Sequence, residues 1–176
     1  MTKSPLKQSL GISVSLLLIL AFAAATTTAQ EKIKVAGTLT MAITQQEMMV
    51  VNEADNHVIS LYAYDGFNKG ASNQAFMHGA QIVNMGTSDL IKGMGSHQGY
   101  VRFTKGGESI LAKWSGKVNT TLSAEGAPLI TFEGTYAYMD GTGQYAHVQG
   151  GGTYSGKYLS KTIVTSDWEG EYSIKK

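Results

Sequence analysis

Glu47 is a carboxylic acid in a short strand-like segment, and it could transfer protons if its side chain pointed into the protein. It shares one strand face with Met49 and Val51, because alternate residues of a strand point the same way. A carboxylic acid enclosed by such apolar groups is suited to proton transfer. The register of this short segment is uncertain, and we favour the alternative, a solvent-facing Glu47.

Arg102 is the other ionisable residue that an inward position would make functional. It is flanked by Tyr100 and Thr104 on one strand face, opposite Val101 and Phe103. A buried guanidinium needs an anion or several carbonyl partners, so an inward Arg102 would hold a carboxylate-bearing ligand. The apolar pair Val101 and Phe103 makes the better core face, which favours an outward Arg102.

Apolar side chains offer a second kind of binding surface. Methionines crowd the N-terminal half, and their flexible thioethers suit both irregular ligands and irregular cores. In the C-terminal half, Trp114 shares a strand face with Ala112 and Val118. We therefore take as candidate ligand-binding residues Trp114, Arg102, Glu47 and Met49.

The sequence predicts no metal and no cofactor. The four histidines lack the close spacing of a two-ligand metal motif. We expect His78 and His97 in glycine-rich loops, with His57 and His147 in or beside strands. The Gly-Thr-Gly run at 141–143 has no strand–loop–helix context, so it predicts a hairpin turn and not a phosphate loop.

One five-residue pattern occurs four times in the C-terminal half: an aromatic residue, Ser or Glu, Gly, any residue, then Tyr or Val. Each copy in a strand places its two large side chains and its glycine on one face. A glycine inside a strand marks a tight bend or a close approach. We expect a curled sheet in which a ring from one strand lies over a glycine of its neighbour. The copies begin at Trp114, Phe132, Tyr154 and Trp168.

Residues 1–29 have the anatomy of a secretory signal peptide. Lys3 and Lys7 precede an apolar run over 10–25, and small residues follow at 27–29. The run is shorter than the ~20 residues of a membrane span, which favours cleavage over anchoring. We predict export to the periplasm or outside the cell, with a mature chain of 30–176 and no stable membrane span.

Composition narrows the class of the mature chain. Loss of Lys3 and Lys7 leaves 12 basic residues (14 − 2) against 13 acidic ones, a net charge of −1. Without a basic stripe, and with Arg102 as its single arginine, the chain is not expected to bind nucleic acid. It contains no cysteine, so no disulfide can stabilise it.

Short strands separated by turns dominate the mature chain. The segment 33–43 alternates cleanly between apolar and polar residues, and further strands are expected over 46–51, 57–64 and 80–85. The segment 65–79 is expected to be a loop or irregular lid. The remaining strands are expected over 99–104, 109–118, 129–138, 145–148, 153–158 and 162–174. This succession predicts an all-β fold, a single antiparallel up-and-down barrel of about eight strands.

The C-terminal half resembles the allene oxide cyclase-like and dirigent-like barrels. The resemblance rests on a Phe-x-Gly strand at Phe132, a Gly-Thr-Gly turn followed by Tyr145, and a glycine-rich strand over 150–156. It covers mainly residues 98–174. It implies an eight-stranded barrel, often oligomeric, that holds an apolar substrate and guides its cyclisation or coupling. No catalytic residue of those enzymes finds a matching motif here.

Three functions follow as expectations. The first is binding of a small apolar ligand inside the barrel, without turnover. The second is a cyclase or isomerase that acts on an apolar substrate by confinement. The third is a structural barrel whose interior is filled by Trp114, Phe132 and Trp168. Tyr62 and Tyr64 lie on the face opposite Leu61, and as an exposed pair they would indicate a homo-oligomer interface.

Overall fold

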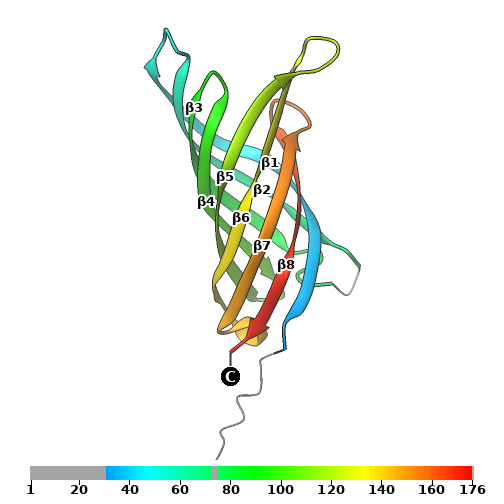
Figure 1. The fold of residues 1–176 in the computed structure, drawn as a ribbon. Helices are drawn as coiled ribbons and strands as arrows, with labels where there is room; N and C mark the ends of the chain where they lie inside the picture. The colour runs from blue at the N-terminus through cyan, green and yellow to red at the C-terminus, as the bar shows by residue number, and fades with distance from the viewer. Residues whose placement is uncertain (1–30, 73–74, 176) are drawn as a thin grey trace, which may run out of the picture.

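Eight antiparallel strands form a closed barrel in the computed structural model, which describes residues 31–72 and 75–175. Each strand pairs with the next along the chain, and the first closes the ring against the last, with Ile33 opposite Tyr172 and Ala42 opposite Ile163 (Figure 1). The predicted signal peptide lies outside the described residues. In the described part of the chain, no helix has the length and apolar character needed to cross a membrane.

The strands are long, and most are joined by short turns, the exception being the longer segment between β2 and β3. One short 3-10 helix, η1, covers Gly143–Tyr145. The strands are β1 Ile33–Asn52, β2 His57–Gly70, β3 Gln81–Ile91, β4 Met94–Lys105, β5 Glu108–Leu122, β6 Pro128–Gly141, β7 Val148–Tyr158 and β8 Ile163–Ile174.

Rings packed over glycines form the inner wall, as the repeated pattern predicts. A Cβ added at Gly86 or Gly99 would lie 2.7 Å or 2.5 Å from the ring of Trp114. Trp168 covers Gly37 in the same way, at 2.8 Å. Glycine therefore gives room for a large ring from the next strand, or at Gly86 from the second strand along, and the sheet curves tightly where these pairs recur.

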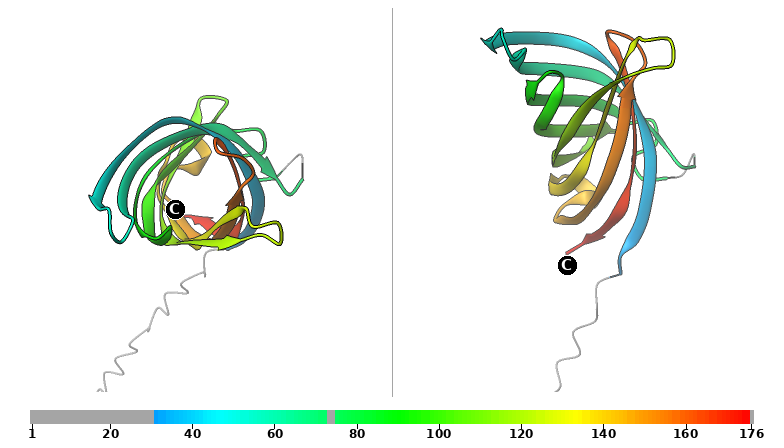
Figure 2. Two further views of the ribbon diagram at one scale, coloured as in Figure 1. Left: turned by 90° about the horizontal axis from the view of Figure 1, so that it is seen from above. Right: turned by 45° about the horizontal axis from the view of Figure 1, so that its top comes forward.

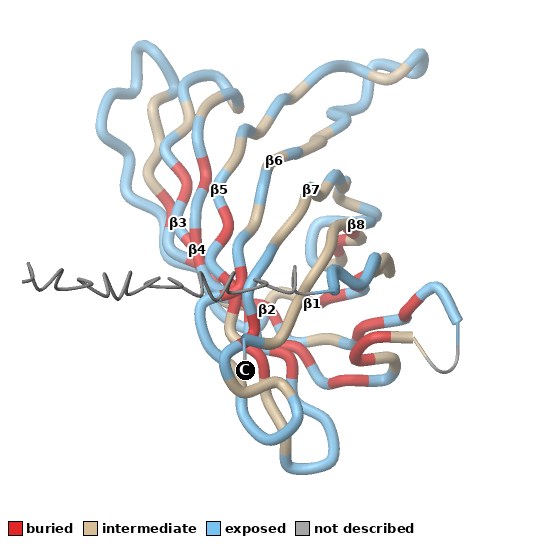
Figure 3. Tube along the Cα trace, turned by 60° about the horizontal axis from the view of Figure 1, so that its bottom comes forward, coloured by how far each residue is buried: buried red, intermediate tan, exposed pale blue. Residues whose placement is uncertain are grey.

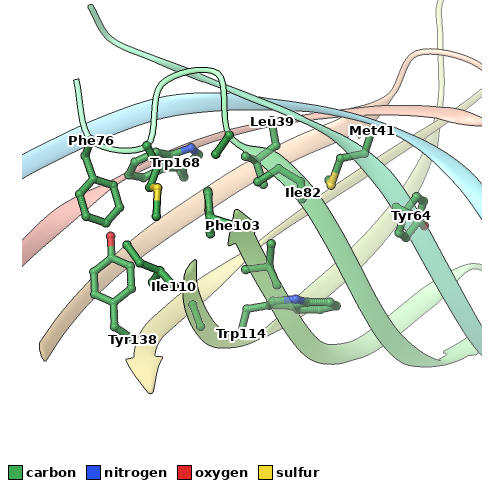
Figure 4. Close-up of a cluster of buried hydrophobic side chains, with 14 of the residues drawn as sticks. Leu39, Met41, Tyr64, Phe76, Ile82, Phe103, Ile110, Trp114, Tyr138 and Trp168 are labelled. Carbon is green, nitrogen blue, oxygen red and sulfur yellow. The ribbon is translucent and has the colours of Figure 1, made fainter. Parts of the chain in front are cut away.

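One end of the barrel is closed by the segment between β2 and β3. Phe76 and Met77 of this segment are buried, and the Phe76 ring centroid lies 4.7 Å from that of Tyr172 and 6.1 Å from that of Trp168. Figure 4 shows Phe76, Trp168 and Tyr138 close together, and Figure 3 shows buried stretches in the segment between β2 and β3 as well as along β3, β4 and β5. The opposite end carries the hairpins that join β1 to β2, β3 to β4, β5 to β6 and β7 to β8, and Figure 2 shows them projecting there.

Several predicted boundaries move in the structure. The segments 33–43 and 46–51 belong to one strand, β1, which is interrupted by a register shift at Thr44. The predicted lid is shorter than expected, because residues 65–70 extend β2. The predicted strand over 145–148 is wrong: η1 and a turn occupy most of it, and β7 begins at Val148.

Candidate functional site

The barrel interior holds a cavity of about 750 Å³. Its walls come from all eight strands, and its lining reaches the hairpin ends at Asn56, Gly93 and Leu159. The packed cluster around Phe76 fills the closed end, and the lining reaches the hairpins at the other end, so the hairpin end is the entrance. Cavities of a few hundred cubic ångströms, mostly apolar with a few placed polar groups, are typical of small-molecule sites.

His97 and Tyr154 form the central polar pair of this cavity. The Tyr154 hydroxyl lies 3.0 Å from His97 Nε2. Their backbones belong to β4 and β7, and in the row of paired residues between them stand only Gly116 and Gly134. A Cβ at Gly134 would lie 2.5 Å from the Tyr154 hydroxyl, so the phenol crosses to His97 only because both positions lack side chains.

Burial keeps both members of this pair uncharged. It lowers the pKa of His97 to about 4 and raises the pKa of Tyr154. At neutral pH the neutral imidazole and the neutral phenol are therefore the stable forms. The pair offers a ligand hydrogen bonds and no full charge.

A second phenol pair spans the lumen near the entrance. The Tyr64 and Tyr158 hydroxyls lie 2.8 Å apart, although β2 and β7 are not neighbours in the sheet. The Tyr62 ring packs edge-on against Tyr64 at 5.1 Å between centroids. Burial raises the pKa of Tyr62 and of Tyr64, so these hydroxyls also stay neutral.

Trp114 is held in the wall by a buried amide. Its indole Nε1 donates to Asn84 Oδ1 at 2.9 Å, and Asn84 Nδ2 approaches Met41 Sδ at 3.7 Å. The indole therefore has a fixed orientation, with its ring packed 4.9 Å from the His97 ring between centroids. Trp114 and His97 together form a rigid aromatic surface on one side of the cavity.

Charge is nearly absent from the cavity lining in the described part of the chain. The one residue with a permanent charge is Lys161, which lies in the turn between β7 and β8 at the entrance. Burying an isolated ion in such an interior is costly unless a partner compensates it. The cavity therefore favours a neutral ligand.

The four candidate binding residues are not brought together. Trp114 is buried and lines the cavity. Arg102 is exposed on the outer face of β4, because Val101 and Phe103 turn inward there. Glu47 and Met49 are also exposed and do not line the cavity; Gln46 and Met48 do. The register shift at Thr44 leaves Glu47 facing outward.

The expectation that Tyr62 and Tyr64 form an exposed pair is wrong. Tyr62 and Tyr64 are buried in the lumen, whereas Leu61 is 55% exposed on the outside. Both faces of this strand carry bulky side chains, so alternation alone did not decide which face was inner. The tyrosine pair is part of the interior site and does not form an outer interface.

The sequence did not indicate His97, Tyr154 or Asn84 as a site. The glycines around His97 looked like a loop, but they lie in β4 and make room for Trp114 and for the backbone of β3. A better signal was available in the inward alternation of His97, Gly99 and Val101, which matches the alternation expected for a strand.

A second hollow, of about 1010 Å³, lies on the outside of the barrel. Exposed charged and hydroxyl side chains dominate it, including Lys117, Glu133, Ser155 and Asp167 from four successive strands. An apolar molecule there would remain in contact with water. The interior cavity is therefore the better candidate site.

Comparisons with known proteins add a fold-level resemblance. No family model and no curated protein matches the sequence. Among solved structures, the chain resembles the pterocarpan synthase dirigent protein GePTS1, with a TM-score of 0.42 and 14% identity over 84% of this chain and 94% of that one. The dirigent-like resemblance expected from the sequence therefore recurs among solved structures, and at this similarity it carries no argument about function.

Proposed function

We propose that the protein binds a small, neutral, apolar ligand inside the barrel. The observation that carries this proposal is the open cavity of about 750 Å³, walled by aromatic and aliphatic side chains. A structural barrel with a filled interior is a weaker reading, because the packed cluster occupies one end and leaves this space. Trp114 supplies the apolar surface, while His97 and Tyr154 supply neutral hydrogen-bonding groups to orient the ligand.

A cyclase or isomerase of the allene oxide cyclase-like type is the second candidate. It is favoured by the presence of His97 and Tyr154 beside the cavity, because confined substrates need few polar groups to be guided. Binding ranks above it, since general bases work best with a pKa near the working pH and burial lowers the pKa of His97 to about 4.

We also propose that the protein is exported from the cytoplasm. The signal-like residues 1–29 would direct the chain to the periplasm or outside the cell, where the barrel would carry its ligand through water. Fractionation of cells producing the full-length sequence, with N-terminal sequencing of the product, tests this. Protein that stays inside the cell with Met1 intact would contradict export.

Filling the cavity tests the binding proposal. Ser88 is buried, lines the cavity and stands beside His97 in the register, whereas its neighbour Thr87 is exposed outside. We expect the unaltered protein to bind naphthalene in equilibrium dialysis. Ser88→Trp should weaken this binding at least about ten-fold by occupying the space, a loss of about 1.4 kcal/mol.

Thr87→Trp is the matched control, since it adds the same ring to the outer face. It should leave naphthalene binding unchanged. Equal binding by all three proteins, or no binding by the unaltered one, would contradict the interior site.

A further inference from the structure

The outer face of β2, β3 and β4 carries a cluster of exposed apolar side chains. Met85 on β3 stands directly opposite Tyr100 on β4, and Val83 is two residues from Met85 on the same face. These strands stand side by side in one wall of the barrel (Figure 1). We call this surface the β2–β4 face; its members and exposed fractions are Leu61 55%, Phe67 62%, Val83 46%, Met85 56% and Tyr100 44%.

Two opposite charges flank the centre of the β2–β4 face. Asp65 on β2 is paired in register with Val83 on β3, and Val83 is paired with Arg102 on β4. Neighbouring strands lie about 4.8 Å apart, so the backbones of Asp65 and Arg102 stand on either side of Val83, about 10 Å from each other. Within residues 31–72 and 75–175, neither of the two takes part in an ion pair.

We propose that the β2–β4 face is a two-fold interface between two copies of this chain. A two-fold axis that runs parallel to β3, above Val83 and midway between the two facing sheets, places β4 of each copy over β2 of the other. Arg102 of the second copy then lies over Asp65 of the first, and the reverse pair forms on the other side of the axis. A two-fold interface must be self-complementary in this way.

The remaining residues also complement each other under this operation. Val83 and Met85 lie at the axis, so each meets its own copy, apolar against apolar. Ala63 is paired with Met85, which is paired with Tyr100, so Ala63 and Tyr100 flank Met85. The same axis places the large Tyr100 ring of one copy over the small Ala63 of the other.

The size of the β2–β4 face sets the expected strength of association. The three strands span about 10 Å between the outer backbones, and the seven residues from Leu61 to Phe67 span about 20 Å, since neighbouring strands lie about 4.8 Å apart and a strand rises about 3.3 Å per residue. The backbone footprint of about 200 Å² is far smaller than the roughly 800 Å² per partner of a standard interface. We therefore expect a weak, reversible dimer that forms at high protein concentration and dissociates on dilution.

Charge reversal tests the proposed pairing by sedimentation velocity across a concentration series. Asp65→Arg alone and Arg102→Asp alone each place like charges face to face and should weaken the dimer at least ten-fold. The double variant restores opposite charges with exchanged positions, and it should dimerise within about three-fold of the unaltered protein. Lys157→Asp on the outside of β7 is the control, and it should leave the dimer intact.

A cross-linking experiment tests the axis itself. The chain has no cysteine, so Val83→Cys gives a single thiol at the axis. A short bismaleimide should join two copies of it rapidly, and should not join two copies of Thr153→Cys, which lies on the outside of β7. A monomer at all concentrations, a trimer, or a dimer insensitive to both single charge reversals would overturn the proposal, as would equal cross-linking of both thiols.

Discussion

The hydroxyl of Tyr154 lies 3.0 Å from Nε2 of His97, although two strands separate the backbones of these residues. The phenol covers that distance by lying across Gly116 and Gly134. One sequence feature, the glycine of the repeated pattern, therefore serves both the curvature of the sheet and the polar centre of the cavity.

Gly134→Ala should destabilise the fold by about 1 to 3 kcal/mol, the usual range for inserting a methyl group into a packed site. Its Cβ would lie 2.5 Å from the Tyr154 hydroxyl and would also meet the backbone of Ser115. Urea unfolding measures the change. Thr135→Ala, at the exposed neighbouring position, is the control and should change stability by less than about 0.5 kcal/mol. Equal stability of Gly134→Ala and the control would contradict this role of the glycine.

Removing either partner of the Tyr154–His97 bond should cost stability in a coupled manner. Tyr154→Phe and His97→Gln each break the same hydrogen bond, so their effects should not add. A double-mutant cycle by urea unfolding should give a coupling free energy of about 0.5 to 1.5 kcal/mol. Additive effects would mean that the two side chains do not interact.

Stability should depend on pH through His97. Burial lowers its pKa from 6.5 to about 4, so between these values the unfolded chain binds the extra proton. Stability from this group is complete above about pH 6.5 and is lost as the pH falls towards 4, by roughly 2 to 3 kcal/mol. His97→Gln should flatten this part of the stability profile. An imidazole that titrates near 6.5 by NMR in the folded protein would contradict the burial argument.

Phe76→Ala should open the closed end. The Phe76 ring contacts Tyr138, Tyr145 and Trp168 as well as Tyr172, and deletion of a buried Phe side chain usually costs about 3 to 5 kcal/mol. Phe67→Ala removes a Phe that is 62% exposed and should cost much less. Thermal unfolding at concentrations below those that permit association compares the two variants. Similar losses would show that Phe76 is not a packing anchor.

Asn68 should couple the closing segment to the barrel wall. It accepts a hydrogen bond from Trp168 Nε1 at 3.0 Å and donates to the carbonyls of Phe76 and Met77 at 3.3 and 2.8 Å. Asn68→Ala should therefore speed hydrogen exchange over 75–80. Asn84→Ala, which removes the corresponding partner of Trp114, should leave exchange in that segment unchanged. Equal acceleration by both variants would indicate general loosening.

Much of the fold could be predicted from the sequence, because its signals are local. The alternation over 33–43 and the aromatic–glycine pattern at Trp114 and Trp168 each depend on the two-residue period of a strand and on the space above a glycine. Both features survive in the structure. The turn at Gly106 and Gly107, where φ is positive, could also be predicted from the sequence.

The site was less predictable because it depends on long-range register. One bulge at Thr44 turned Glu47 outward, and no local feature marks that bulge. The partners His97 and Tyr154 stand 57 residues apart and meet only through the pairing of the intervening strands. Tyr62 and Leu61 compete for the inner face with similar bulk, and closure of the ring decides between them.

The most direct test of an interior binding site is a crystal structure of the protein soaked with 1-bromonaphthalene, with the bromine located by its anomalous scattering. We predict a bromine peak in the lumen near Trp114, His97 and Tyr62, with the Tyr154–His97 bond retained. A lumen filled by its own side chains, with bromine found only on the outer surface, would contradict the account.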